Sequence, residues 1–323
     1  MIVEPLLRYI NKFKNLRTDR AHHGSAPHKP ILLLSLIKAF QKGVIHDKRI
    51  YITPELVALF KTNWNLLVTS HYYCQFALPF YHLKSDGFWS LIPKPGFENI
   101  LQFKSSMRSF SNLNAAVDFA MIDDDLCNLL KNQKNRNILQ QFLLDEYFPK
   151  KEKEFSNSLS EQEKLFIDIE DKILNESPEE YRKEIKKLLS EQNDEEVYIR
   201  GSLFKREIPR IYNNTCCISG MRIDATVEVS MVDACHIIPF CESYNDTVTN
   251  GIALCPNLHR AFDRGLITID KEYNVIVSKT FREEESYYSI HQFHNKEIIL
   301  PKQKEYHPLQ ENISWHREKI FKK

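Results

Sequence analysis

The sequence lacks any apolar run of transmembrane length, and its N-terminus has no charged segment followed by an apolar one. It also lacks internal repeats and low-complexity segments. These absences exclude a membrane-spanning protein and a chain with a signal peptide, so we expect a soluble, cytoplasmic protein without a membrane partner. Its 323 residues, 42% of them hydrophobic and 27% charged, have the composition of a globular protein of two domains.

The cysteines form no regular framework. Their odd number fits a reducing compartment better than a secreted disulfide scaffold. No two of them form a Cys-x-x-Cys unit, so a structural zinc is not expected, although Cys217 and Cys255 could supply half of such a site. We expect these two to be buried free thiols and Cys216 to be exposed. The seven positions are Cys74, Cys127, Cys216, Cys217, Cys235, Cys241 and Cys255.

The net charge of +1 hides a strong asymmetry along the chain. Residues 1–122 carry 15 Lys and Arg against 7 Asp and Glu, residues 123–196 carry 12 against 20, and residues 197–323 carry 17 against 16. A basic first region suits a polyanionic partner, because Lys and Arg displace counterions from phosphates. Charge alone is equally compatible with a solubility imbalance.

Hydrophobic periodicity predicts an α+β protein of three regions, at residues 1–122, 123–196 and 197–323. Residues 30–40 should form a buried core helix that Gly43 ends, because they are apolar on almost every side. The middle region has no glycine and should be a helical connector, with Ser160 and Glu163 at capping-box spacing. The other expected elements are helices at 6–13, 126–147, 160–174, 178–189 and 202–212, two strands flanking the turn-rich stretch 242–250, and a hairpin of 266–269 with 275–278.

The most informative stretch runs from residue 227 to residue 269. It contains Ala-Cys-His-Ile-Ile-Pro at 234–239, then Asn-Gly-Ile-Ala-Leu-Cys at 250–255 and Pro-Asn-Leu-His-Arg-Ala-Phe-Asp-Arg-Gly at 256–265. Pro256 fits the start of a helix and Gly265 the residue beyond its end, so a helix is expected at about 256–264. On it, His259 and Asp263 are four residues apart and share one face, as two ligands of one metal ion would. His236 lies in an apolar, β-branched context that predicts a strand.

These residue types suit phosphodiester hydrolysis. The reaction needs a base that activates water, an electrophile that neutralises charge on the phosphate, and a group that orients the base. Taken singly, His236 could be structural, Asn250 could form only a turn, His259 could be a capping residue, and Asp263 could pair with a neighbouring arginine. Their order in a strand, a loop and a helix favours the catalytic interpretation.

The segment resembles the HNH (ββα-metal) nuclease family, in the branch with an Ala-x-His-Ile-Ile-Pro strand and an Asn-Gly-Ile-x-Leu-Cys…His-x-x-Phe-Asp helix. Arg-Gly-Ser-Leu-Phe-Lys-Arg at 200–206 and Cys-Ile-Ser-Gly at 217–220 also fit that branch. The resemblance, over about residues 200–280, implies an endodeoxyribonuclease that uses Mg²⁺, Mn²⁺ or Ni²⁺. It implies that His236 is the general base, Asn250 positions it, His259 binds the metal, and Asp263 is a second helix ligand.

The sequence departs from the family at Cys235. Many members have Asp or His directly before the catalytic histidine as a metal ligand, whereas a thiolate is soft and suits Mg²⁺ poorly. Cys235 remains a candidate ligand. Asp233 is a possible substitute, but on a strand it should face the side opposite to His236.

A second set of motifs lies in the basic N-terminal region: Gly-Ser-Ala-Pro-His-Lys-Pro at 24–30, Leu-Pro-Phe-Tyr-His-Leu at 78–83 and Asp-Gly-Phe-Trp at 86–89. Over about residues 5–120 they resemble the sulfur-binding domain of phosphorothioate-dependent HNH restriction enzymes. The resemblance implies that Pro79 lines an apolar pocket for the sulfur of a modified phosphate and that His28 and Lys29 approach the phosphates. Leu78 stands where the family often has Tyr, which keeps the pocket apolar but removes a ring.

Two further expectations concern this region. Phe80 and Phe88 should belong to the core. A basic cluster should contact DNA, although a solvated loop is the alternative; its members are Arg17, Arg20, His22, His23, His28 and Lys29.

Together these features predict a modification-dependent, type IV-like restriction endonuclease, with a DNA-recognition domain at 1–122, a connector at 123–196 and an HNH nuclease domain at 197–323. The expected partner is double-stranded DNA, phosphorothioated in the favoured interpretation, and a homodimer is left open. A second interpretation keeps the nuclease but assigns the first domain to another DNA feature or to unmodified duplex. A third makes the HNH part a degenerate module that only binds DNA.

Overall fold

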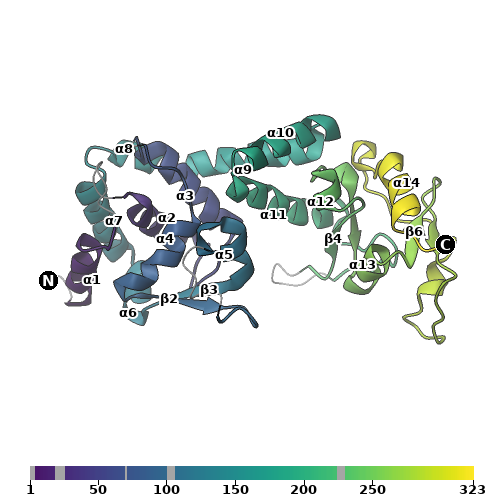
Figure 1. Cartoon of the computed structure of the whole chain (residues 1–323), viewed down its shortest axis with the longest axis horizontal. Helices are drawn as coiled ribbons and strands as arrows, with labels where there is room; N and C mark the ends of the chain where they lie inside the picture. The colour runs from purple at the N-terminus through teal and green to yellow at the C-terminus, as the bar shows by residue number, and fades with distance from the viewer. Residues whose placement is uncertain (1–3, 19–25, 70, 100–105, 224–229) are drawn as a thin grey trace. The chain divides into compact units, whose positions relative to one another are not determined.

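The computed structural model describes residues 4–18, 26–69, 71–99, 106–223 and 230–323. The chain divides into two compact units (Figure 1): residues 1–166 with 194–199, and residues 167–193 with 200–323. The predicted connector at 123–196 is thus distributed over both units. Within the described ranges, no helix is long and apolar enough to cross a membrane.

The core of the first unit contains α2 (His28–Lys42), in which every residue from His28 to Phe40 is buried. The expected core helix is confirmed, and it begins two residues before Pro30. Gly43 ends it at a φ of 74°, a left-handed conformation that glycine adopts without a Cβ clash. α2 packs against α3 (Pro54–Leu67), α4 (Ala77–His82) and α7 (Gln133–Tyr147).

A three-stranded antiparallel sheet accompanies these helices, in the order β1 (Arg49–Ile50), β3 (Val117–Ile122), β2 (Trp89–Pro93). Phe80 and Phe88 are fully buried, so their predicted place in the core is confirmed. The other helices of this unit are α1 (Glu4–Lys14), α5 (Phe110–Ala116), α6 (Asp124–Lys131) and α8 (Glu152–Ser156), with short 3-10 turns at Leu83–Asp86 and Ser106–Arg108.

Two predicted helices differ from the structure. The expected helix at 126–147 is two helices, α6 and α7, because Asn132 takes an extended conformation and its side chain accepts a hydrogen bond from the Asn135 amide as the cap of α7. The expected capping box at Ser160 and Glu163 is wrong, since α9 (Ser158–Asn175) begins two residues earlier and Ser160 lies inside it.

The second unit contains the strands and the helix of the predicted nuclease segment. β4 (Asp233–His236) pairs antiparallel with β5 (Gly251–Leu254), which places Cys235 opposite Ile252 and His236 opposite Gly251. α13 (Pro256–Asp263) follows β5 directly. Pro256 starts the helix and Gly265 lies beyond its end at a φ of 69°, as predicted.

Further elements of this unit pack around that core. α11 (Asp194–Ile211) begins eight residues before the predicted start, and α14 (Gln310–Lys319), which was not predicted, packs on β6 (Ile267–Ile269). β6 forms the expected hairpin with β7 (Val275–Val277). The remaining elements are α10 (Pro178–Ser190), α12 (Phe240–Ser243) and 3-10 turns at Val248–Asn250, Ile290–Phe293 and Lys304–Tyr306.

Candidate active site

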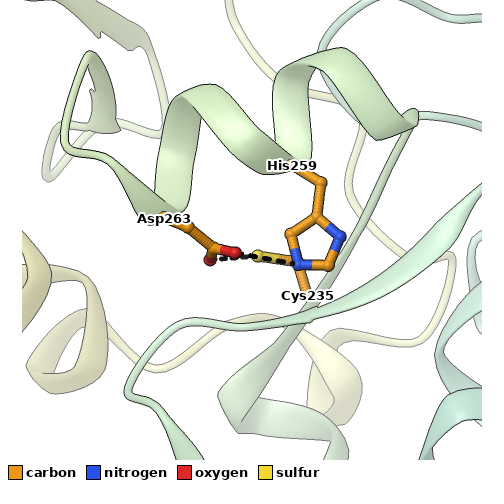
Figure 2. Close-up of side chains that lie close together, drawn as sticks. All are labelled: Cys235, His259 and Asp263. Carbon is orange, nitrogen blue, oxygen red and sulfur yellow. Dashed lines mark hydrogen bonds and ion pairs between the residues drawn. The ribbon is translucent and has the colours of Figure 1, made fainter. Parts of the chain in front are cut away.

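Three candidate metal ligands meet where β4 faces α13. One ligand atom each from Cys235, His259 and Asp263 lies within 4.8 Å of the others (Figure 2). The four-residue spacing on the helix brings His259 Nε2 within 3.5 Å of Asp263 Oδ2. Cys235 reaches the same place from the strand, with its Sγ 3.9 Å from Asp263 Oδ1.

The three donors differ in chemistry. Cys235 is fully buried, and burial raises the pKa of its thiol well above the usual value. A protonated thiol is a poor metal ligand, and in this state the S–H donates toward the Asp263 carboxylate. The side chains of His259 and Asp263 are 25% and 58% exposed, so an imidazole and a carboxylate are accessible from solvent.

Asp233 lies beside His259. Its Oδ2 is 3.3 Å from His259 Nδ1, and His259 therefore has a carboxylate at each ring nitrogen. The alternation of β4 places Asp233 on the face of Cys235, opposite to His236. This contact of Asp233 with the helix was not predicted from the sequence.

His236 is held by two groups that sequence reasoning did not identify. Its Nε2 is 2.9 Å from Oδ1 of Asp246, a side chain that is 1% exposed. Its ring stacks on Phe204 of α11, with centroids 4.0 Å apart and an interplanar angle of 13°. Asp246 belongs to the stretch predicted only as turn-rich, and no signal in the sequence pointed to it.

Asn250 is fully buried, and its side chain forms hydrogen bonds with main-chain groups. Its Oδ1 accepts from the amide of Ile238, and its Nδ2 donates to the carbonyls of Ile238 and Asn245, each at 3.0 Å. These bonds fix the loop between His236 and β5. No hydrogen bond joins the side chains of Asn250 and His236 among the described residues, so the two are connected only through the loop.

One pocket brings His236, His259 and Asp263 together. Lys205 of α11, which is exposed, and the buried His316 of α14 also line it. His316 stacks on Phe262, and its two ring nitrogens lie 2.9 Å from Thr268 Oγ1 and 3.1 Å from the Phe262 carbonyl. Burial lowers the pKa of His316 to about 4.

The cysteines beside α13 correct one expectation. Cys216 is fully buried, whereas exposure was predicted, because it packs against Cys255 at the N-terminus of α13. A hydrogen bond between the two thiols lowers the pKa of Cys216 and raises that of Cys255. Cys217 is buried, as expected, and Cys255 is half-buried.

The N-terminal motifs line a pocket in the first unit. Leu78 and Pro79 contribute apolar atoms, and Arg17 and Arg108 are exposed basic residues at the same pocket. Arg108 was not among the predicted contacts. Arg20, His22 and His23 lie outside the described residues.

His28 and Lys29 also line this pocket, but their side chains are engaged within the protein. Lys29 Nζ is 2.6 Å from Asp86 Oδ2 and donates to the carbonyl of Arg17, and this ion pair is almost completely buried. His28 Nε2 is 2.9 Å from the carbonyl of Tyr73, and burial lowers the pKa of His28. Both side chains line the pocket, but their polar atoms are bound within the protein, whereas direct contacts with phosphates were expected.

Comparison with known proteins finds a nuclease family that matches part of the chain. A family model described as HNH endonuclease matches residues 216–270. A search of curated proteins found no match. Among solved structures, a modification-dependent TagI restriction endonuclease is similar at 21% identity over 37% of this chain and 38% of that chain, with a TM-score of 0.26. The matched segment carries His236, Asn250, His259 and Asp263, so this part of the chain is similar to HNH endonucleases.

Proposed function

We propose that this protein is a divalent-metal-dependent DNA endonuclease that hydrolyses phosphodiester bonds. The observation that carries the proposal is the single pocket in which a strand histidine, His236, lies beside the helix pair His259 and Asp263. A base and a metal-binding pair within one pocket are what the attack of water on a phosphate diester requires.

The residues present fit a divalent cation such as Mg²⁺, Mn²⁺ or Ni²⁺. His259 Nε2 and an oxygen of Asp263 would hold it, because imidazole and carboxylate suit these ions better than a buried, protonated thiol does. Asp233 accepts a hydrogen bond from Nδ1–H of His259 and so leaves the lone pair at Nε2 for the ion. When bound, the ion polarises the phosphate and neutralises its developing charge.

The other residues of the pocket have separate roles. His236 accepts a proton from the attacking water, whose oxygen then bonds to phosphorus while the bond to the leaving sugar oxygen breaks. Lys205 presents a positive charge at the pocket wall, where it would attract the phosphate backbone. Cys235 and Asn250 keep the strand and the loop in place.

For the first unit we propose recognition of modified DNA, as in a type IV-like restriction enzyme. Arg17 and Arg108 would contact phosphates, and Leu78 with Pro79 would receive the sulfur of a phosphorothioate, which is larger and more weakly hydrated than oxygen. The net charge of +8 in residues 1–122, from 15 basic and 7 acidic residues, supports a polyanionic ligand. Recognition of another DNA feature or of unmodified duplex is the second candidate, supported by the same exposed arginines.

Cleavage of matched phosphorothioated and unmodified duplexes, with Mg²⁺, Mn²⁺ or Ni²⁺, tests the proposal. We expect cleavage that EDTA stops and that is faster on the modified duplex. Pro79→Asp should remove that preference, because it places a charge in the apolar wall. Equal cleavage of both duplexes would refute phosphorothioate recognition and leave the nuclease standing, whereas no cleavage of any duplex with any of the three metals would refute the nuclease.

A further inference from the structure

The ring of His236 has one occupied and one open nitrogen. Nε2 faces Asp246, while Nδ1 has no hydrogen-bond partner among the described residues and the ring lines the pocket. Phe204 stacks on the ring and so holds its plane, while the contact of Nε2 with Asp246 decides which edge of the ring faces the pocket. Which nitrogen can accept a proton therefore depends on what Asp246 does to Nε2.

The Asp246 carboxylate has a neighbouring donor group at each of its two oxygens. Its Oδ1 faces His236, and its Oδ2 accepts from the hydroxyl of Tyr181 at 3.4 Å. Tyr181 is fully buried and lies on α10, outside the segment that matches the HNH model. Arg182 of α10 donates from Nε to the carbonyl of Ser243 at 3.0 Å, so the helix also holds the loop that carries Asp246. A carboxylate this deeply buried is stable only with such partners.

We propose that Asp246, supported by Tyr181, is the positioning residue that fixes the tautomer of His236. A carboxylate oxygen only accepts, so Nε2 must carry the hydrogen and the lone pair is left on Nδ1. This inference rests on the proposed nuclease function. In the reaction, Nδ1 takes the proton from water, the water oxygen bonds to phosphorus while the bond to the leaving sugar oxygen breaks, and the resulting imidazolium is stabilised by the Asp246 carboxylate.

Substitution by asparagine separates this role from simple packing. Asp246→Asn keeps the size of the side chain, but its amide group can donate to Nε2 and thereby favour the tautomer with hydrogen on Nδ1. That tautomer has no lone pair on the pocket side. We expect kcat to fall by about 10²–10⁴-fold, the range for loss of a correctly poised general base, while KM for DNA and the affinity for Mn²⁺ stay within about twofold.

The decisive measurement is the tautomer itself, read from long-range ¹H–¹⁵N spectra of the full chain labelled at histidine, with His236 assigned by comparison with His236→Ala. We expect hydrogen on Nε2 in the wild type and on Nδ1, or a mixture, in Asp246→Asn. Asp168→Asn is the matched control, because Asp168 is an exposed residue of α9 whose one ion pair within the described part of the chain is with Lys172. It should leave the tautomer, kcat and KM unchanged.

The spectrum keeps this proposal separate from the nuclease proposal. Hydrogen on Nδ1 in the wild type, or an unchanged tautomer and kcat in Asp246→Asn, would overturn the role of Asp246 even if DNA is cleaved. If the protein has no nuclease activity, the proposed function is refuted. The spectrum would still test the contact between Asp246 and Nε2 of His236. If Asp246→Asn does not fold, Tyr181→Phe removes one hydroxyl only. It should lower kcat several-fold at constant KM, and an unchanged kcat would refute the support by Tyr181.

Discussion

Gly251→Ala should destabilise the second unit, because side chains of α11 pack so closely on Gly251 that no Cβ fits there. Gly251 has an extended φ of −130° and pairs with His236 in the β4–β5 ladder. A Cβ at this position would lie 2.3 Å from Cδ1 and 2.8 Å from Cγ1 of Ile208, and 2.9 Å from Cε2 of Phe204. Carbon atoms in good contact are about 3.5–4.0 Å apart, so α11 would have to retreat by roughly an ångström.

Overpacking of this kind costs about 1–3 kcal/mol. For a domain of about 150–250 residues, 1 kcal/mol moves Tm by about 2–4 °C, so thermal unfolding should show a Tm lower by roughly 2–12 °C. Cleavage should fall as well, measured well below the lowered Tm, because Phe204 would be displaced from the His236 ring on which it stacks.

Two companion variants make the test specific. Ile208→Val removes Cδ1, the nearest atom, and should recover part of the lost stability in the Gly251→Ala background, although alone it costs about 0.5–1.5 kcal/mol. Gly201→Ala is the control: Gly201 lies in α11, where an added Cβ would meet no atom within 4 Å, and the change should be neutral or stabilising by up to about 1 kcal/mol. Wild-type stability in Gly251→Ala, or additive losses in the double variant, would refute the packing argument.

Four further predictions follow from the two pockets. His236→Ala should lower the cleavage rate by about 10²–10⁴-fold with DNA binding nearly intact in gel-shift titrations, and wild-type turnover would refute the general base. His259→Ala should weaken Mn²⁺ binding in calorimetric titrations and abolish cleavage, and Asp263→Ala should do the same; an unchanged affinity in the latter would leave Asp263 a structural role only. Arg17→Ala should weaken binding of modified and unmodified duplex alike and reduce the salt slope of log K by about one, and a loss restricted to one duplex would contradict a phosphate contact. Because the folded pKa of His316 is about 4 against 6.5 unfolded, its neutral form contributes stability above pH 6.5 that is lost as the pH falls toward 4, by roughly 2 kcal/mol at pH 5. Urea unfolding at pH 7 and pH 5 should show a smaller difference in His316→Asn, and an equal difference would contradict this assignment.

Features encoded by linear spacing were predictable from the sequence. The four-residue interval of His259 and Asp263 specifies a shared helix face, and Pro256 with Gly265 delimits the helix that carries them. The buried α2 was likewise evident from its continuous apolar run, and Gly43 from its place after that run. In each case the physical determinant acts within a few residues along the chain.

Features that depend on distant pairs were not predictable. Asp246 meets Tyr181 across 65 positions, and nothing local distinguishes it from an ordinary turn residue. Lys29 was expected at the DNA surface from its place in the Ala-Pro-His-Lys-Pro motif, but it forms a buried ion pair with Asp86, 57 positions away. Removal of one partner from such a pair leaves an uncompensated buried charge, so Lys29→Ala would report on folding more than on DNA binding.

The contrast between local and distant contacts also explains why the segment that matches the HNH model does not contain the whole site. Residues 216–270 contain the proposed base and the proposed metal-binding pair, but several of the groups that hold them come from outside that range. Phe204 of α11 stacks on His236, and Tyr181 of α10 donates to Asp246. His316 of α14 donates from Nε2 to the carbonyl of Phe262, next to Asp263, and its Nδ1 faces the hydroxyl of Thr268. A short ββα segment has too little core to fix these side chains by itself. The flanking helices supply packing and hydrogen bonds that help to hold the proposed base and the proposed metal-binding pair in one pocket.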